Sequence, residues 1–330
     1  MSILESLSQK FMISTKELRS FIKTAPYRYK VYPIPKRNGK GSRVIAQPSD
    51  VLKMMQRMVL EEFLSELPVH SCAAAYREGL SIKDNAEAHA KNQYLLKMDF
   101  SDFFPSMAPA DLINHIVKHK GAITAEDAYM VRKLFFWARK QDPTYRLSIG
   151  APSSPFISNT LMYSFDCVLQ DYCEKMGVTY TRYADDITLT TNVKGLLLNM
   201  PSYVRSICKE IAYPTLKVNE QKTVFSSKKS NRHVTGLVIN NEDQVSLGRE
   251  RKRYIRSLIH KSSLGGLTDE EMHNLKGLLA FAKYIEPTFY KSALDKYGLP
   301  TLYLIETFQS NPKVIESLGK KEAVPVGDVF

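Results

Sequence analysis

Two adjacent carboxylates, Asp185 and Asp186, are the residues whose type and spacing best suit chemistry in this chain. They fall within residues 179–191, where β-branched and aromatic residues flank a short acidic turn, so the pattern predicts a strand, a tight bend and a second strand. Like charges this close disfavour the ionisation of both groups, so a fold that keeps them needs a compensating cation. Mg²⁺ is the natural candidate because it binds hard oxygen ligands. The alternative is a solvated Asp-Asp turn.

A third carboxylate, Asp99, ends the upstream stretch of residues 94–99, which alternates in the manner of a half-buried strand. We therefore expect Asp99 to lie beside the tip of the predicted hairpin. Three carboxylates in one place match the needs of two-metal nucleotidyl transfer. In that chemistry two Mg²⁺ ions bind through a few protein oxygens and substrate phosphates, and they stabilise the attacking and leaving oxygens of an in-line displacement.

The ordered set of motifs resembles a reverse transcriptase. Tyr183-Ala184-Asp185-Asp186 on a hairpin, preceded by Asp99 with an aromatic residue five positions later at Phe104, is similar to the palm of that family. The resemblance implies an α+β fold, the right-hand polymerase of fingers, palm and thumb, whose palm is an antiparallel sheet backed by helices. It assigns residues 1–93 to N-terminal helices and fingers, 94–240 to the palm with part of the fingers around 109–150, 241–318 to the thumb, and 319–330 to a loosely ordered tail.

The activity that this resemblance implies is RNA-directed DNA synthesis, in which a primer hydroxyl attacks the α-phosphate of a dNTP. Two Mg²⁺ ions would be held by Asp99, Asp185, Asp186 and the backbone carbonyl of Phe100. The ring of Phe104 would lie beneath the sugar of the incoming nucleotide and clash with a 2′-hydroxyl, so that deoxyribonucleotides are selected. The alternative for Phe104 is a core residue that packs beside its aromatic neighbours.

A basic β-hairpin is predicted over residues 26–48, where aromatic and basic positions alternate around the turn signal Asn38-Gly39. By resemblance this hairpin belongs to the fingers, and Arg43 with Lys36 or Arg37 would contact the triphosphate, because a guanidinium fork can grip phosphate oxygens. The alternative is a solvated hairpin that follows the template backbone.

Two further positions are implied at the nucleotide. The loop of Gly150 would lie against the new base pair, although Ile149 stands where the family usually has Gln, which puts the polar contact there in doubt. Lys222 would donate a proton to the departing pyrophosphate, since an ammonium group is protonated at neutral pH. An ordinary surface lysine is the alternative.

Two features resemble retron reverse transcriptases in particular. Asn85 and His89, four residues apart and so on one face of a helix, form an Asn-Ala-x-x-His pattern just before the first catalytic strand. The second feature is Val234-Thr235-Gly236, which follows a basic run. We expect these residues to contact RNA or the primer strand, the alternative for Asn85 and His89 being a satisfied pair on a helix surface. Arg251 and Arg253, in a basic helix, would lie against the duplex backbone unless that helix is merely solvated.

Retron membership would imply a cognate noncoding RNA that serves as template and as primer, priming from an internal 2′-hydroxyl, and branched RNA-linked DNA (msDNA) as the product. Such systems commonly act in anti-phage defence with a separate effector protein. The rival hypotheses are a reverse transcriptase of the abortive-infection or diversity-generating type and a catalytically inert, RNA-binding palm protein. A group II intron enzyme would continue into a maturase segment.

Composition agrees with a nucleic-acid partner. The 330 residues carry a formal net charge of +12 and a sequence pI of about 9.3, so a polyanionic partner is expected. The cysteines, Cys72, Cys167, Cys173 and Cys208, have neither CxxC nor zinc spacing and are expected to be thiols in a reducing compartment. No apolar run approaches the ~18 residues of a membrane span, so a cytoplasmic protein without a membrane partner is expected.

The sequence also makes local predictions. Thr15 is expected to cap a second N-terminal helix in preference to Ser14, and Ser154 to cap a helix with Pro155 at its first position. Val51 and Met54 are expected in the buried stripe of a helix over residues 48–66. His115 and His119 are expected at the surface and not at a metal site.

Overall fold

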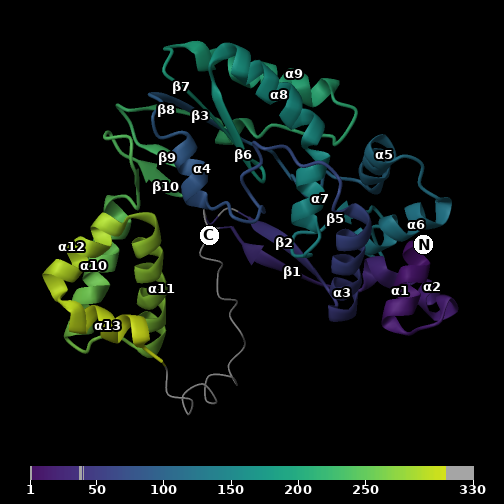
Figure 1. Ribbon diagram of the computed structural model, residues 1–330, viewed down its shortest axis with the longest axis horizontal. Coiled ribbons are helices and arrows are strands. Elements are labelled where there is room, and N and C mark those ends of the chain that lie inside the picture. The colour runs from purple at the N-terminus through teal and green to yellow at the C-terminus, as the bar shows by residue number, and fades with distance from the viewer. Residues whose placement is uncertain (1, 37–38, 40, 310–330) are drawn as a thin grey trace. The chain divides into compact units, whose positions relative to one another are not determined.

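The computed structural model describes residues 2–36, 39 and 41–309 of the chain (Figure 1). The chain forms two compact units: Met1–Ser81 with Gln93–Phe225 make up unit 1, and Ile82–Asn92 with Ser226–Phe330 make up unit 2. Across the described ranges, no helix is long and apolar enough to cross a membrane.

Unit 1 begins with two capped helices, α1 (Ile3–Phe11) and α2 (Thr15–Thr24). The N-cap of α2 is Ser14, whose hydroxyl accepts a hydrogen bond from the Glu17 N–H while the Glu17 carboxylate accepts one from the Ser14 N–H. The prediction of Thr15 as the cap is therefore wrong, because only Ser14 has an acidic partner three residues later with which to close a capping box.

The predicted basic hairpin is confirmed. A 3₁₀ turn, η1 (Ala25–Tyr27), leads to strands β1 (Tyr29–Pro35) and β2 (Ser42–Pro48), which pair antiparallel from Tyr29↔Pro48 to Pro35↔Ser42. Arg37 and Asn38, which include the first residue of the predicted turn, lie outside the described residues.

Helix α3 (Asp50–Val59) follows the hairpin and continues into a π-helical turn, η2 (Leu60–Leu64). Its buried face is Leu52, Met55, Gln56 and Val59. Val51 and Met54 are 46% and 56% exposed, so their predicted place in the core is wrong. The spacing of the buried residues, i, i+3, i+4 and i+7, turns both side chains away from that face.

A four-stranded sheet has the strand order β6-β7-β3-β8; its first three strands belong to unit 1, and β8 spans the end of unit 1 and the start of the next segment of unit 2. The strands are β3 (Tyr94–Asp99), β6 (Thr179–Tyr183), β7 (Asp186–Thr191) and β8 (Val224–Ser227). Strand β7 pairs antiparallel with β6 and with β3, and it is buried from Ile187 to Thr191. The two stretches that the sequence predicts as catalytic strands are therefore direct neighbours.

Helices and short elements complete unit 1. They are α5 (Pro109–Lys120), α6 (Ala125–Phe135), β4 (Phe136–Trp137), β5 (Arg146–Leu147), α7 (Ser154–Leu161), α8 (Tyr163–Met176), η3 (Leu196–Asn199), α9 (Met200–Glu210) and η4 (Glu220–Lys222). Helix α8 packs against β6 and against α9, as Figure 1 shows. It ends at Gly177, whose φ of 64° is the left-handed conformation that glycine adopts most readily.

Two further local predictions are wrong. Helix α7 begins at Ser154 itself, and its N-cap is Ser153, which makes no side-chain cap hydrogen bond. His115 is buried, not exposed, because its Nε2 lies 2.8 Å from the Thr160 hydroxyl and its ring packs against His119. Burial lowers the pKa of His115 to about 4, so the imidazole is neutral at pH 7.

Unit 2 combines a small sheet with helices. Its sheet has the order β11-β10-β9, formed by β9 (Arg232–Val234), β10 (Leu237–Ile239) and β11 (Val245–Ser246), and helix α4 (Ile82–Ala88) contacts β9 and β10. The C-terminal helices are α10 (Arg249–Ser263), α11 (Asp269–Ile285), α12 (Pro287–Tyr297) and α13 (Leu299–Thr307). Helix α11 contacts each of the other three.

Candidate active site

The predicted acidic hairpin is confirmed. Strands β6 and β7 pair up to Tyr183↔Asp186, which leaves Ala184 and Asp185 in the turn. Ala184 has a φ of 55°, a left-handed conformation that a residue with a Cβ rarely adopts. This turn brings the two carboxylates of Asp185 and Asp186 to one end of the sheet.

Asp99 lies at the same end of the sheet. In the antiparallel ladder of β3 and β7, Asp99 is directly opposite Asp186, and the Phe100 N–H donates to the Asp185 carbonyl at 3.2 Å. Directly opposed residues have Cβ atoms about 5 Å apart. The register therefore brings Asp99 to the adjacent pair Asp185 and Asp186, from which it is far apart in the sequence.

Burial and nearby negative charges make Asp185 and Asp186 reluctant to ionise. Burial, followed by the charges of Asp99 and Asp186, raises the pKa of Asp185 to about 6. Burial also raises the pKa of Asp186, although the ammonium of Lys97 opposes that shift. A cation placed among the three groups would relieve both effects.

One cation of the protein already contacts the cluster. The Lys222 Nζ donates to Asp99 Oδ2 at 2.6 Å, and Asn219 Nδ2 donates to Asp99 Oδ1 at 3.4 Å. The Asn219 N–H also donates to the Asp99 carbonyl at 2.7 Å. The sequence singled out Lys222 for a different reason and did not single out Asn219, because a pairing across more than a hundred residues leaves no local signal.

Arg43 and Gly150, two of the residues expected to contact the incoming nucleotide, both lie among the described residues. Arg43 on β2 is exposed, and its charge opposes the rise that burial causes in the pKa of Asp186. Gly150 has a φ of 118°, and a Cβ at this position would lie 3.1 Å from the Ile45 side chain of the same hairpin. The loop and the hairpin thus touch, since the Ala46 N–H also donates to the Ile149 carbonyl at 2.9 Å.

Lys36 is exposed on the hairpin, whereas Arg37 lies outside the described residues. Phe104 is half-buried and meets Phe103 edge to face, with ring centroids 5.3 Å apart. This position is compatible with either reading of Phe104, as a gate or as a core residue.

Tyr76 is a residue that sequence analysis missed. It is 51% exposed, has a φ of 60°, and its phenol interacts electrostatically with Asp185, Tyr183 and Arg43. Burial and the charge of Asp185 raise its pKa to about 12, so it stays a neutral hydroxyl at working pH. The sequence feature that could have pointed to Tyr76 is its place as an aromatic residue just before a turn that contains Gly79.

Comparison with known proteins decides the family. The sequence profile described as "Reverse transcriptase (RNA-dependent DNA polymerase)" matches residues 34–239. Retron Ec83 reverse transcriptase of Escherichia coli is 40% identical over 282 residues, which cover 85% of this chain and 90% of that protein. Retron Ec73 reverse transcriptase of the same organism is 34% identical over 301 residues, covering 88% of this chain and 94% of that protein.

This chain belongs to the retron reverse transcriptases.

Membership confirms the predicted activity class and fold. The protein is an RNA-directed DNA polymerase with an α+β polymerase fold, and its family generally uses divalent metal ions. The matched residues 34–239 include Asp99, Asp185, Asp186 and Lys222. The identity to retron enzymes favours this branch over the abortive-infection and diversity-generating types.

Two solved structures to which this retron reverse transcriptase is similar share little sequence with it. The foamy viral protease-reverse transcriptase in complex with double-stranded DNA has a TM-score of 0.47 and 18% identity, covering 86% of this chain and 40% of that one. Apo telomerase from Candida tropicalis has a TM-score of 0.46 and 14% identity, covering 84% of this chain and 60% of that one. This chain thus spans less than two thirds of either.

The donor chemistry of the acidic cluster fits a hard divalent ion. Asp99, Asp185 and Asp186 offer carboxylate oxygens, and burial together with neighbouring negative charge raises the pKa of Asp185 and Asp186. Among the described residues, no group of three or more His, Cys, Asp or Glu side chains has the arrangement of a formed metal site. Asp99 is instead engaged by Lys222.

The two retron features come together in unit 2. Asn85 Nδ2 lies 3.5 Å from the Thr235 hydroxyl, which donates to the Ile82 carbonyl at 3.1 Å. Asn85, His89 and Val234 are buried, whereas Gly236 is exposed. Burial lowers the pKa of His89 to about 3, so its ring is neutral. This arrangement favours a supporting role for the buried side chains beneath a turn that exposes Gly236.

Arginines of unit 2 divide into buried and exposed groups. Arg232, which the sequence places in a basic run, is fully buried and donates to the carbonyls of Ala90, Asn92 and Asn240. Arg253 on α10 is exposed, and Arg251 Nη1 lies 3.5 Å from the Gly236 carbonyl. The exposed group is available to a polyanion, whereas Arg232 holds the end of the α4 segment to the small sheet.

Proposed function

We propose that this enzyme reverse-transcribes a cognate noncoding RNA that serves as both template and primer, starting from an internal 2′-hydroxyl and producing branched RNA-linked DNA (msDNA). The observation that carries the catalytic part of the proposal is the register that puts Asp99 opposite Asp186, beside Asp185. Support for the retron part comes from the identity to proteins named as retron reverse transcriptases. The proposal includes a cytoplasmic role in anti-phage defence alongside a separate effector protein.

In this proposal Asp99, Asp185 and Asp186, with the Phe100 carbonyl, hold two Mg²⁺ ions. Such ions, when bound, stabilise charge on the attacking and leaving oxygens of phosphoryl transfer. The carboxylates must be ionised to serve; burial raises the pKa of Asp185 and Asp186, and the charge of Lys222 opposes that rise. Lys222 also has the ammonium proton that departing pyrophosphate needs.

The incoming dNTP would meet side chains from several segments of unit 1. Arg43 and Lys36 or Arg37 of the hairpin would bind the triphosphate, and Gly150 would allow close approach of the backbone to the base pair. Phe104 would exclude the 2′-hydroxyl. The hairpin then serves as part of the fingers, and residues 94–240 as the palm.

The RNA partner would be gripped by residues of unit 2. Gly236 and Thr235 lie in a turn over Asn85, His89 and Val234, and Arg251 and Arg253 present cations on α10. Phosphates are bound by such cations without regard to sequence, whereas exposed turns can read a particular RNA shape. Residues 241–309 would act as the thumb, whereas residues 310–330, which include the rest of the predicted thumb and the predicted tail, lie outside the described residues.

Incorporation of labelled dNTP on an RNA template annealed to a DNA primer, with Mg²⁺ present, tests the catalytic assignment. Asp185→Asn should abolish incorporation, because the amide cannot replace a carboxylate at the ions. Asp50→Asn is the matched control, since the Asp50 side chain is 94% exposed at the start of α3 and should leave the rate unchanged. Wild-type activity of Asp185→Asn would remove the assignment.

Sequencing of the nucleic acid that copurifies with the protein tests the retron part. The expected result is a single structured RNA joined through a 2′-position to DNA that is complementary to part of it. Unlinked DNA copied from many unrelated RNAs would contradict priming from a cognate RNA while leaving the polymerase activity intact.

A further inference from the structure

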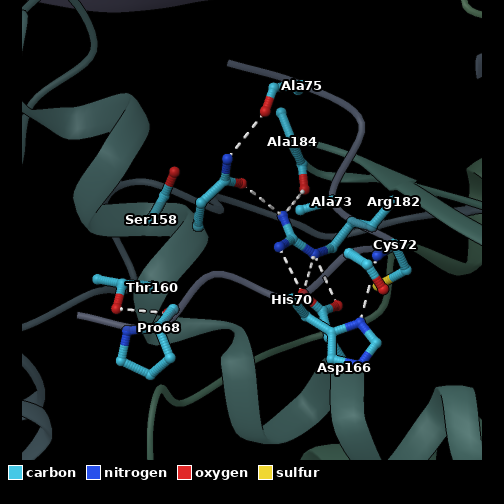
Figure 2. Close-up of polar contacts among 12 residues, drawn as sticks. Pro68, His70, Cys72, Ala73, Ala75, Ser158, Thr160, Asp166, Arg182 and Ala184 are labelled. Atoms are coloured by element: carbon cyan, nitrogen blue, oxygen red, sulfur yellow. Dashed lines mark hydrogen bonds and ion pairs between the residues drawn. The ribbon is translucent and has the colours of Figure 1, made fainter. Parts of the chain in front are cut away.

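A buried polar network adjoins the catalytic turn and is centred on Arg182 of β6 (Figure 2). Arg182 and Asp166 of α8 are both fully buried. The guanidinium donates to both carboxylate oxygens, from Nε to Oδ1 at 2.9 Å and from Nη2 to Oδ2 at 2.6 Å. The Tyr180 hydroxyl donates to the same carboxylate at 2.7 Å. Asp166 thereby fixes the plane of the guanidinium.

The remaining arm of the guanidinium reaches the catalytic turn. Arg182 Nη1 donates to the Ala184 carbonyl at 3.2 Å and to Asn159 Oδ1 at 3.1 Å. Ala184 is the residue before Asp185, and its φ of 55° is a left-handed conformation that a non-glycine residue rarely adopts. The hydrogen bond therefore holds the strained peptide unit from which the Asp185 side chain projects.

The peptide units around Asp185 are thus held on both sides. Arg182 binds the carbonyl before it, and the Phe100 N–H binds its own carbonyl at 3.2 Å. Since Phe100 directly follows Asp99, these two contacts fix the backbone of Asp185 relative to that of Asp99.

Arg182 and Asn159 also hold a neighbouring segment, residues 72–76. Asn159 Nδ2 donates to the Ala75 carbonyl at 2.8 Å, as the contact at the labelled Ala75 in Figure 2 shows. The backbone of Arg182 pairs with the same segment, donating to the Cys72 carbonyl at 2.9 Å and accepting from the Ala74 N–H at 2.8 Å. The segment leads into Tyr76, whose phenol interacts with Asp185.

Stability alone is a poor explanation for this network. A buried ion pair gains little over well-packed apolar residues, because the desolvation of both charges offsets their attraction. An apolar side chain at position 182 could fill the same volume, but it could not hydrogen-bond the Ala184 carbonyl. The feature that needs an arginine is the simultaneous contact with Asp166, Asn159 and the turn.

We propose that Arg182, fixed by Asp166 and Asn159, is a positioning residue that sets the orientation of the Asp185 carboxylate for nucleotide addition. This inference rests on the proposed role of Asp185. A misplacement of about 1 Å at such a group can slow a reaction about 100-fold.

Pre-steady-state incorporation of a single dNTP on an annealed RNA template and DNA primer separates positioning from folding. In Arg182→Lys the charge facing Asp166 is kept, but one ammonium cannot reach Asp166, Asn159 and the Ala184 carbonyl together. The rate constant of the first turnover should fall about 10- to 100-fold. The dNTP concentration for half-maximal rate should change less than about threefold. A purely structural role would lower the burst amplitude, through loss of folded enzyme, and leave the rate constant unchanged.

A second readout does not depend on turnover. Binding of Mn²⁺ by the free enzyme, followed by the electron paramagnetic resonance signal of the unbound ion, should weaken in Arg182→Lys and in Asn159→Ala. Gln56→Met is the matched control, because Gln56 is equally buried in unit 1 and hydrogen-bonds to Tyr29 and the Leu134 carbonyl. It should lower the melting temperature and leave the rate constant and Mn²⁺ binding unchanged.

Two failures can be told apart. If Asp185→Asn abolishes incorporation while Arg182→Lys and Asn159→Ala keep the wild-type rate constant and Mn²⁺ binding, the positioning role of Arg182 is overturned. If Asp185→Asn itself retains wild-type incorporation, the proposed catalytic site is overturned instead.

Discussion

At the scale of single residues, the charge of Asp185 depends on what surrounds it. Its carboxyl is half-buried, and Asp99 and Asp186 add repulsion that Lys222 opposes only in part. The same conditions that make the site attractive to a cation make it costly for the protein alone. The charge of Asp185 that suits the function therefore lowers the stability of the metal-free protein, and this loss can be measured by removing the charge.

Replacing Asp185 by Asn should stabilise the metal-free protein at neutral pH. The pKa of Asp185 is about 6 in the folded chain against an ordinary 3.8, so the folded state holds this proton more tightly than the unfolded state. The stabilisation of the folded state by protonated Asp185 is therefore fully present below about pH 4 and is lost as the pH rises through 6. At pH 7.5 in EDTA, Asp185→Asn should gain about 2 kcal/mol and melt about 4–8 °C higher.

Melting curves across pH check the sign of this effect. The gain from Asp185→Asn should shrink towards zero at pH 4, where the wild-type carboxyl is already protonated. Asp50→Asn, at an exposed position, should show no such dependence. A gain of equal size at pH 4 and pH 7.5 would show that ionisation of Asp185 is not the cause.

Phe104→Ala should admit ribonucleotides. The ring is half-buried against Phe103, and its removal would open space where a 2′-hydroxyl could fit. The preference for dNTP over NTP, measured as the ratio of kcat/KM values, should fall about 10- to 200-fold. Phe104→Tyr keeps the bulk of the ring and should keep the preference. Unchanged sugar selectivity in Phe104→Ala would make Phe104 a core residue only.

At the scale of elements, periodicity predicted much of unit 1. Alternation identified the strand ending at Asp99 and the basic hairpin, whereas β-branched and aromatic residues on both sides of an acidic turn identified the acidic hairpin. Adjacent strands then predicted the meeting of Asp99 with Asp186. Periodicity could not show which polar side chains are buried, because a polar side chain is buried only where a partner from another segment satisfies it.

Arg182 and Lys222 illustrate that limit. Arg182 occupies a strand position that an exposed arginine would fill equally well, and only the presence of Asp166 and Asn159 makes it a buried residue. Lys222 of η4 pairs with Asp99 of β3, and no local pattern records a contact between residues so far apart in the sequence. In the same way, residues 82–92 join unit 2 although more than a hundred residues separate them from its other part.

Ser14→Ala should destabilise unit 1 through helix α2. The Ser14 hydroxyl satisfies the Glu17 N–H, and its loss leaves that donor at the helix start without its cap. The expected cost is about 1 kcal/mol, seen as a melting temperature about 2–4 °C lower. Thr15→Ala is the matched control, because Thr15 is the first helical residue and not the cap. Equal effects of the two substitutions would contradict the capping assignment.

At the scale of the whole molecule, charge predicts how binding responds to salt. The chain carries a formal net charge of +12, and α10 has Arg249, Arg251, Arg253 and Arg256 within two turns. A protein that neutralises phosphates releases counterions, so its affinity falls as salt rises. Each phosphate contact that is lost should reduce the steepness of this dependence by about one in a plot of log K against log salt.

Arg253→Ala should therefore weaken binding to the copurified RNA and reduce the salt slope by about one. Arg253 is exposed on α10, so its loss should remove a phosphate contact without disturbing the fold. The matched control is Arg19→Ala, which removes the same charge from α2, where Arg19 pairs with Glu126 at 2.6 Å. If both substitutions changed the slope equally, net charge alone would govern binding. A slope altered only by Arg253→Ala, measured by filter binding between 50 and 200 mM salt, would instead locate an RNA phosphate at α10.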